Sequence, residues 1–523
     1  VLKLLQETYL GKIKMIYIDP PYNTGNDFVY EDDFSQNATE YTSNSGQYDD
    51  QGNRLVANTE SKGRFHTNWL NMIYPRLRLA KDLLSDDGVI FISIDDNEQA
   101  NLKKICDEIF GEKSFIGEII RKTKTMTADN RNGFNFQHEM LVIYARNKNN
   151  VWLEGEEKSF KNYTNSDNDP NGDWCSGDPS AKSGGESLRY PIENPYTHKI
   201  DYPPKGRFWA FSKKTLQEYI QNGRIKFKKD YKEGERGFIF KRYKNTMEND
   251  KDPLSSLLGI SNEFMNQNAT NETKELFGNI IFDYPKPIVF LEKIINSSIR
   301  DNSIILDFFS GSATTAHAVM KLNAEDGGHR KFIMVQIPEK CDEKSEAYKA
   351  GYKNICEIGK ERIRRAGKQI LDEMKNKKGD LFSDEVSLDI GFRDLKLDSS
   401  NMNDVYYTPE ETDQRMLNGL ESNIKADRSA EDLLFQVMLD LGVLLSAKIV
   451  EETISGKKIF NVDDNYLIAC FDEDVDEAVI MEVANKKPTY FVMRDSSLAN
   501  DSVSVNFDQI FMRYSPDTVR KVL

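Results

Sequence analysis

The stretch Lys14-Met15-Ile16-Tyr17-Ile18-Asp19-Pro20-Pro21-Tyr22 decides how this chain folds, because a continuous apolar run stops there at a proline turn. The run from Met15 to Ile18 is typical of a strand buried on both faces of a sheet. Each proline fixes its own φ and keeps the residue before it extended. Open α/β sheets bind their ligands at the carboxyl ends of strands. We therefore expect a buried strand with a ligand site at its end.

The residues after this strand bring together a carboxylate, a carbonyl and an aromatic ring. Asp19 and the Pro20 carbonyl can accept hydrogen bonds from an amine, and Tyr22 can lie flat on a ring. Together these groups suit a planar ring that carries an amino group. The alternative is a strand that simply ends in a proline turn. The carboxylate before the prolines favours the site.

Alternation of strands and helices predicts the fold class. Further buried strands are expected at Val89–Ile94, Ser303–Phe309 and Lys331–Ile337. Apolar residues at helical spacing between the first two strands, from Trp69 to Leu84, predict a helix. The pattern is that of an α/β protein with a mostly parallel sheet.

Breaks in this alternation divide the chain. We expect residues 1–116 and 283–380 to form the two halves of one α/β core, residues 117–282 to be an inserted domain, and residues 381–523 to be an acidic α+β domain. In the last domain, Ser429–Ile449 predicts a helix that is apolar on more than one side. Such a helix belongs in a core or at an interface.

Composition indicates a soluble protein of a reducing compartment. The 523 residues carry a net charge of -15, with 38% hydrophobic and 30% charged residues. The five cysteines have no paired short spacing, which predicts neither disulfides nor a zinc site. No signal peptide or membrane-spanning run is visible. Because Val1-Leu2-Lys3 already reads as mid-helix, we expect that a natural N-terminal segment is missing.

The insert contains a basic stretch with interleaved aromatics. Between Lys205 and Lys244 there are 13 basic residues and four acidic ones. A local positive patch in an acidic chain is typical of nucleic-acid binding. The alternative is a solvated basic face, and composition does not separate the two. The candidate contacts are Lys205, Arg207, Lys226, Lys228 and Lys229.

A second site-like segment is Asp307-Phe308-Phe309-Ser310-Gly311-Ser312, where a strand runs through a turn of small residues into a helix. Small residues let the backbone approach a ligand, and a helix start offers free N–H groups. We expect Ser312 or Thr314 to cap this helix. On its own such a loop is weak evidence for a site.

In combination, these motifs resemble the beta class of amino-DNA methyltransferases, and most closely the modification subunits of Type III restriction–modification systems. In that class the catalytic motif precedes the S-adenosylmethionine loop, with the target-recognition region between them. The resemblance is carried by Asp19–Asn26, Trp69–Leu77, Asp87–Asp96, Gly206–Trp209, Tyr284–Pro287 and Asp307–Ser312.

The resemblance implies a Rossmann-like methyltransferase core and a set of site residues. It assigns catalysis to Asp19, Pro20, Pro21 and Tyr22. It assigns cofactor binding to Lys286, Pro287, Asp307, Phe308, Phe309, Gly311, Ser312 and Gln336. The chain departs from the family in two places. Ala313 replaces a usual glycine, and Gln336 replaces an acidic residue for the cofactor ribose, a role that Glu339 could fill instead.

The implied activity is methyl transfer from S-adenosylmethionine to the 6-amino group of an adenine flipped out of double-stranded DNA. The implied assembly is a homodimer that recruits a Type III restriction subunit in the bacterial cytoplasm. Two alternatives stay open, namely a methyltransferase that acts on RNA or a protein amide, and a catalytically silent DNA-binding subunit. No phosphate loop of an ATP-driven motor is present.

Overall fold

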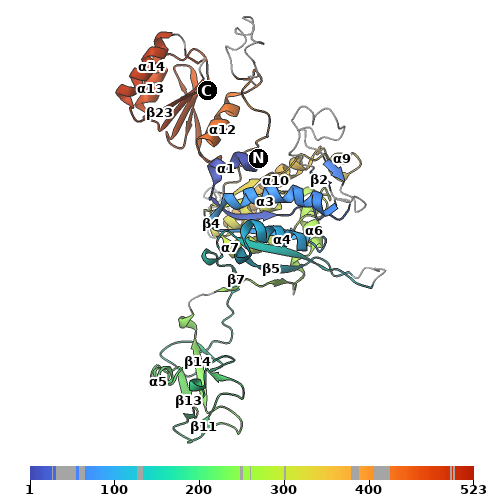
Figure 1. Ribbon diagram of the computed structural model, residues 1–523, viewed down its shortest axis with the longest axis vertical. Helices are drawn as coiled ribbons and strands as arrows, with labels where there is room; N and C mark the ends of the chain where they lie inside the picture. The colour runs from blue at the N-terminus through green and yellow to red at the C-terminus, as the bar shows by residue number, and fades with distance from the viewer. Residues whose placement is uncertain are drawn as a thin grey trace. The chain divides into compact units, whose positions relative to one another are not determined.

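The computed structural model describes residues 1–25, 28–30, 55–57, 65–126, 133–247, 251–259, 261–299, 302–378, 388–403, 424–494, 497–498 and 501–523. These residues form two compact units (Figure 1). One unit is Leu153–Ser255, and the other contains Val1–Trp152 and Ser256–Leu523.

A seven-stranded sheet is the centre of the larger unit. Its strand order is β16 (Leu257–Leu258), β5 (Phe115–Lys122), β6 (His138–Ala145), β4 (Leu84–Ile94), β1 (Ile13–Ile18), β17 (Ile304–Asp307) and β18 (Lys331–Met334). Strands β4, β1, β17 and β18 are parallel, whereas β6 is antiparallel to both β4 and β5. The predicted α/β fold is confirmed. The four predicted strands are adjacent and parallel, and β16 is also parallel to β5.

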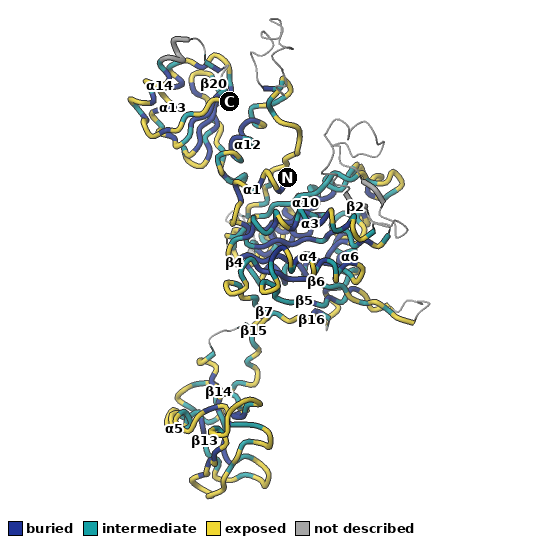
Figure 2. The backbone as a smooth tube through the Cα atoms, viewed as in Figure 1, coloured by how far each residue is buried: buried dark blue, intermediate teal, exposed yellow. Residues whose placement is uncertain are grey.

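Helices cover both faces of this sheet, which explains the unbroken apolar run in β1. Ile16 and Ile18 belong to the core formed with α1 (Leu2–Tyr9), α3 (Phe65–Leu83) and α4 (Gln99–Phe110). Tyr17 lies between these two residues and therefore points to the opposite face of the sheet. There its ring contacts Phe290 of α7 (Ile288–Ser298) edge to face, with ring centroids 6.3 Å apart. Figure 2 shows that the residues of the central strands are largely buried.

Two further helices, α8 (Thr314–Asp326) and α10 (Ile355–Lys378), pack against β18. Apolar residues of α8 form a small core with α10, which includes Ala316, Met320, Ile363 and Ala366. Helix α6 (Asn266–Phe277) also contacts α10. These helices surround the segment that follows β17.

The segment that the sequence assigned to one insert divides between the two units. Strands β5, β6 and β16 pair within the central sheet. The pairing of β5 with β6 is antiparallel with no helix between them, so the strand–helix alternation that marks the core is missing there. The separate unit is the shorter segment Leu153–Ser255.

Short strands and one helix build the separate unit. They are β7 (Glu154–Glu157), β8 (Trp174–Ser176), β9 (Ser180–Ala181), β10 (Ile192–Glu193), β11 (Ile200–Asp201), β12 (Phe208–Trp209), α5 (Lys213–Gln221), β13 (Ile225–Phe227), β14 (Phe238–Tyr243) and β15 (Lys251–Pro253). Its core is largely aromatic, with Trp209, Phe211 and Phe238 buried together. Many of the aromatics interleaved with basic residues are therefore core residues.

The C-terminal region has a five-stranded sheet of its own. The strand order is β19 (Ile449–Ile454), β20 (Lys457–Val462), β21 (Leu467–Cys470), β22 (Tyr490–Met493) and β23 (Val519–Val522). Helices α13 (Glu477–Asn485) and α14 (Asp501–Tyr514) pack on it. The region is α+β, as predicted, and its expected start after residue 380 lies outside the described residues.

The apolar helix of this region is shorter than predicted. Helix α12 spans Ala430–Asp440, because Gly442 adopts a positive φ of 70° just beyond its end. Leu433 and Leu434 pack with the C-terminal sheet. The following Leu444 and Leu445 pack against the core of the central sheet. Both apolar sides of this segment are therefore in contact within the chain.

Candidate active site at the carboxyl ends of β1 and β17

The two sequence motifs meet because β1 and β17 are parallel neighbours. Ile16 pairs with Leu306, so Asp19 and Asp307 follow at the same edge of the sheet. The Asp307 side chain is buried, and this burial raises its pKa to about 7. Hydrogen bonds from Thr315 Oγ1 (2.6 Å) and the Phe309 N–H (3.2 Å) oppose the rise, whereas the charge of Asp19 adds to it.

Hydrogen bonds hold the segment Asp19–Asn23, which follows β1, in place. Trp69 Nε1 donates to the Pro21 carbonyl at 2.7 Å. Asn23 has a positive φ of 60°, and its Nδ2 donates to Oε1 of the buried Glu98 at 2.5 Å. Within the described part of the chain, no donor is bonded to the Pro20 carbonyl. This carbonyl is thus available as an acceptor.

Asp19 and Tyr22 share a buried lysine. The Tyr22 hydroxyl donates to Asp19 Oδ1 at 2.9 Å. Lys286 Nζ lies 2.7 Å from Asp19 Oδ2 and donates to Tyr22 Oη at 2.9 Å. The resemblance assigns Lys286 to the cofactor, but its contacts are with Asp19 and Tyr22, which the resemblance assigns to catalysis.

A buried ion pair that sequence reasoning missed supports Tyr22. Glu139 on β6 can accept from the Tyr22 hydroxyl at 3.1 Å and lies 2.6 Å from Nη2 of Arg121 on β5. Arg121 also donates to the Phe264 carbonyl at 2.6 Å. Burial alone would raise the pKa of Glu139, but Lys286 and Arg121 outweigh it and hold the pKa at about 2. Glu139 is therefore a permanent carboxylate.

Tyr22 is correspondingly hard to ionise. Burial, and then the charges of Asp19 and Glu139, raise its pKa well above the usual value. The hydroxyl carries one proton, so it donates to only one of the two carboxylates at a time. The hydroxyl end of the ring is thereby held by three charged side chains, and the ring itself packs against the core of the central sheet.

The loop after β17 has the predicted small residues but a different cap. Gly311 has a φ of 50°, and a Cβ there would lie 3.2 Å from Cζ of Phe282. Ala313 is the N-cap of α8 in the left-handed region, with φ 60° and ψ 38°, and no side chain caps the helix. The prediction that Ser312 or Thr314 caps α8 is wrong, because the Ser312 hydroxyl accepts from Arg362 Nη1 at 2.9 Å.

Polar side chains hold this loop in place. Gln336 Oε1 accepts from the Gly311 N–H at 2.7 Å, and its Nε2 donates to the Ile337 carbonyl at 3.2 Å. Arg362 on α10 is buried, which lowers its pKa to about 10. Burial also raises the pKa of Glu339, whose carboxylate accepts no hydrogen bond from the described residues. Glu339 is thus the freer of the two candidates for a ribose hydroxyl.

Of the remaining predicted cofactor residues, Phe308 is buried in the core, and Phe309 packs against it with its ring centroid 5.5 Å from that of Phe308. Pro287 is the N-cap of α7, directly after Lys286. Arg121, Glu139, Glu98 and Arg362 carry no local motif, so only the fold reveals them. Asn26, at the end of the first quoted motif, lies outside the described residues.

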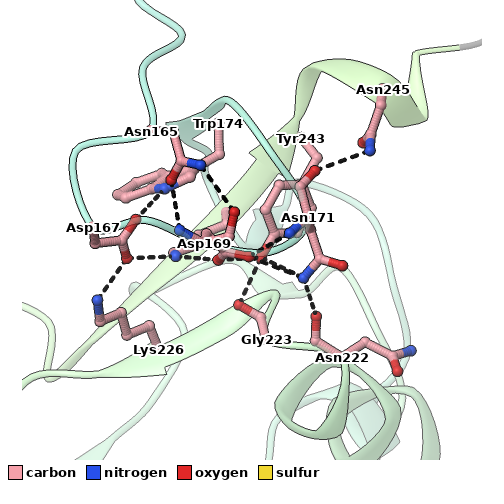
Figure 3. A network of polar contacts seen from close by, with 11 residues as sticks. Asn165, Asp167, Asp169, Asn171, Trp174, Asn222, Gly223, Lys226, Tyr243 and Asn245 are labelled. Carbon is pink, nitrogen blue, oxygen red and sulfur yellow. Dashed lines mark hydrogen bonds and ion pairs between the residues drawn. The ribbon is translucent and has the colours of Figure 1, made fainter.

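In the separate unit, acidic residues neutralise part of the predicted basic patch. Lys226 Nζ lies 2.5 Å from Asp167, which also contacts the buried Lys241 at 2.6 Å, and Lys241 pairs with Asp169 (Figure 3). Hydrogen bonds from Lys226 and Lys241 lower the pKa of Asp167. The unit as a whole has 19 basic and 17 acidic residues, so it is nearly neutral.

The other candidate contacts differ in their surroundings. Arg207 donates to Asp178 at 2.8 Å, and Lys228 lies 3.6 Å from Glu235. Lys229 is exposed over the Tyr196 ring, with its Nζ 5.4 Å from the centroid. Lys205 is exposed with no acidic partner in the described part of the chain. Lys205 and Lys229 are therefore the candidates best placed to meet phosphate.

The described residues contain neither a candidate membrane span nor a candidate metal site. No helix there is long and apolar enough to cross a membrane. No group of three or more His, Cys, Asp or Glu side chains in that part of the chain could hold a metal ion. The five cysteines are free thiols.

The chain is similar to known restriction–modification proteins. It is 39% identical over 380 residues to the Type III restriction-modification enzyme StyLTI Mod subunit of Salmonella typhimurium, which covers 71% of this chain and 56% of that one. It is 34% identical to the EcoPI Mod subunit of Escherichia phage P1 (71% and 61%) and 32% identical to the Type II methyltransferase M.KpnI of Klebsiella pneumoniae (68% and 82%).

These similarities cover a defined part of the proteins. The chain spans less than two thirds of the length of the two Mod subunits. Residues 13–366 match the N6/N4 methyltransferase family, described as DNA methylase. This match begins at β1 and extends into α10, so it includes both motifs and everything between them. The chain therefore belongs to the DNA methylase family of N6/N4 methyltransferases.

Proposed function

We propose that the chain is a DNA methyltransferase that uses S-adenosylmethionine to methylate the 6-amino group of adenine, as the modification subunit of a Type III restriction–modification system. The observation that carries this proposal is the meeting of Asp19 and the unbonded Pro20 carbonyl with the small-residue loop after β17. A double acceptor for an amine then lies beside a backbone that a cofactor can approach. Family membership and the similarity to Mod subunits support the same reading.

The loop residues fit the proposed cofactor. S-adenosylmethionine supplies a methyl group on a sulfonium, which makes the methyl electrophilic. The start of α8 has N–H groups without a side-chain cap. Asp307 and Glu339 are acceptors for its ammonium and hydroxyl groups. We assign the ribose to Glu339, because both ends of the Gln336 amide are engaged within the chain.

The motif residues suit an amine that is a poor nucleophile. The lone pair of the adenine amine is delocalised into the ring, and the base must leave the duplex at a cost of a few kcal/mol. Asp19 and the Pro20 carbonyl accept the two amine hydrogens, which favours a pyramidal nitrogen with a localised lone pair. Tyr22 stacks on the base, which returns about 1–3 kcal/mol. Catalysis then rests mainly on positioning.

The preference for adenine rests on the Asp19-Pro20-Pro21-Tyr22 form of the motif, in which an aspartate precedes the two prolines. The separate unit, Leu153–Ser255, is the proposed target reader on double-stranded DNA.

Homodimer formation and recruitment of a restriction subunit are proposed from the resemblance. Because α12 and Leu445 already pack within the chain, we expect these partners to bind other surfaces of the C-terminal region. Light scattering on the protein with and without residues beyond 380 tests the homodimer.

The deciding experiment compares wild type with Asp19→Ala. Methyl incorporation from labelled S-adenosylmethionine into duplex DNA should disappear in the variant, while its Kd for the cofactor stays largely unchanged. Near-normal methylation by Asp19→Ala would contradict the mechanism. Methylation of RNA in place of DNA, or no methylation by the wild type despite DNA binding, would favour one of the two alternatives. Lys14→Met, which removes the ion pair between Lys14 of β1 and Asp87 of β4, is the control.

A further inference from the structure

Lys286 holds its ammonium beside the catalytic carboxylate in a fixed position. The side chain is only 9% exposed, whereas that of Asp19 is 24% exposed. Nζ lies 2.7 Å from Asp19 Oδ2 and 2.9 Å from Tyr22 Oη. Glu139 Oε2 is 3.6 Å away, which is beyond a good hydrogen bond. An ammonium has three N–H donors, so one of them is left for a ligand at this point.

The pair Asp19–Lys286 therefore presents an acceptor next to a donor, 2.7 Å apart. This is the pattern of a carboxamide, the group by which Asn and Gln bind adenine through two hydrogen bonds. In adenine and cytosine, the amine is a donor and the ring nitrogen bonded to the same carbon is an acceptor. In guanine and thymine this order is reversed, because a carbonyl oxygen lies beside a ring N–H.

We propose that Lys286 is a specificity-determining residue that donates to this ring nitrogen while Asp19 accepts from the amine. The proposal rests on the proposed function and deepens it, because it states how the pocket selects an amino base. A guanine or thymine in the same position would set a carbonyl oxygen against the Asp19 carboxylate and a ring N–H against the ammonium. Both contacts are repulsive, so these bases are rejected.

The surrounding charges make such a donor compatible with methyl transfer. A bare cation near the amine would oppose the positive charge that develops on nitrogen as the methyl group arrives. Lys286 is balanced by Asp19 at 2.7 Å and by Glu139 at 3.6 Å, and Arg121 in turn pairs with Glu139. The four groups sum to no net charge. Lys286 can thus serve as a hydrogen-bond donor without leaving an unbalanced positive charge at the reacting nitrogen.

Single-atom changes in the base test this assignment on the wild-type protein. The recognition duplex, identified by mapping methylated bases in DNA from cells that express the full-length protein, is prepared with adenine, 1-deazaadenine or 7-deazaadenine at the target. An abasic site opposite the target removes any difference in base pairing. Replacing N1 should lower kcat/KM about 5- to 150-fold, the range of one good base contact. Replacing N7 should change it little.

A variant makes the test specific to Lys286. In Lys286→Met the difference in kcat/KM between adenine and 1-deazaadenine should vanish, whereas Lys14→Met should keep it. Changing the lysine and the base nitrogen singly and together forms a double-mutant cycle, which isolates the interaction between Lys286 and N1. Equal rates of the wild type on adenine and 1-deazaadenine would overturn the proposal, as would an undiminished difference in Lys286→Met. If the variant does not fold, the wild-type comparison decides alone. Failure of the wild type on unmodified adenine would instead contradict the proposed function.

Discussion

The backbone N–H of Gly311 donates to Oε1 of Gln336 at 2.7 Å, which ties the loop after β17 to the end of β18. The family resemblance points to position 336 for the ribose of the cofactor. The structure gives the Gln336 side chain a different task, because it holds the loop backbone and its own amide is satisfied at both ends. The nearby Glu339 has a carboxylate without such bonds in the described residues.

The first prediction separates these two residues. Glu339→Ala should weaken S-adenosylhomocysteine binding about 10- to 150-fold, since a hydrogen bond to a charged group contributes about 1.5–3 kcal/mol. The measurement is calorimetric titration with S-adenosylhomocysteine and with analogues that lack one ribose hydroxyl. If Glu339 binds the ribose, the difference between parent and analogue disappears in Glu339→Ala and persists in Gln336→Ala. The reverse pattern would return the role to Gln336.

The second prediction concerns the ion pair behind Tyr22. Arg121→Met leaves Glu139 buried without its main partner, so the free energy of unfolding should fall by about 3–5 kcal/mol. The exposed pair Lys349–Glu346 is the control, and Lys349→Met should change stability by less than about 1 kcal/mol. Urea denaturation midpoints provide the measurement. A loss in Arg121→Met no larger than in the control would mean that water reaches the pair.

The third prediction is a pH dependence of stability due to Asp307. Its folded pKa of about 7 is above the ordinary unfolded value of about 3.9. Between these values the unfolded chain releases the proton and the folded chain keeps it, so the contribution to stability falls as pH rises from about 4 to 7. The total change is at most about 4 kcal/mol. Above pH 7 the contribution of Asp307 to stability is constant.

Asp307→Asn removes this titration. The difference in urea midpoint between variant and wild type should shift in favour of the variant from pH 5 to pH 7 and then level off. Asp326 is the control, because a hydrogen bond from Arg330 lowers its pKa. The midpoint difference for Asp326→Asn should be flat over this range. A flat difference for Asp307→Asn as well would show that the carboxyl group is already ionised at pH 5.

The fourth prediction concerns the basic residues of the separate unit. Lys205→Gln and Lys229→Gln should each weaken duplex DNA binding and reduce the slope of log K against log salt by about 0.9. Lys226→Gln should instead lower the stability of the unit, because Asp167 loses one of its two lysine partners. Binding titrations at several salt concentrations, with a thermal melt of each variant, distinguish these effects. An unchanged slope for both exposed lysines would assign them to a solvated face.

The sequence predicted the parts of the fold that have a local signal. The strand Met15–Ile18 and the loop at Gly311 each depend on residues adjacent in the chain, and both are found where predicted. The α/β class followed from their alternation. The boundaries of the insert were less predictable, because β5 and β6 pair antiparallel without an intervening helix.

The support of the site could not be predicted in the same way. Glu139 and Arg121 come from two separate strands, and each looks like an ordinary charged residue in its own segment. Lys286 was assigned to the site only through the resemblance, which did not indicate its contacts with Asp19 and Glu139. Their roles depend on strand order, which brings β6, β5 and the start of α7 near Tyr22. Similarly, the net basic count of Lys205–Lys244 did not reveal that Asp167 and Asp169, earlier in the chain, pair with two of its lysines.

The pairing of Ile16 with Leu306 also fixes an order of events during synthesis on the ribosome. β1 can pair with β4 early, since Ile16 and Ile90 are close in sequence. Its other neighbour emerges about 290 residues after it, which at about 5–20 residues per second is roughly 15–60 s later. During that interval the separate unit, Leu153–Ser255, can fold by itself. The strand that carries Asp19 meanwhile exposes an unpaired apolar edge, the kind of edge that promotes aggregation. Slow translation of the middle of the gene would lengthen this exposure, so the yield of folded protein should depend on chaperones that bind nascent chains.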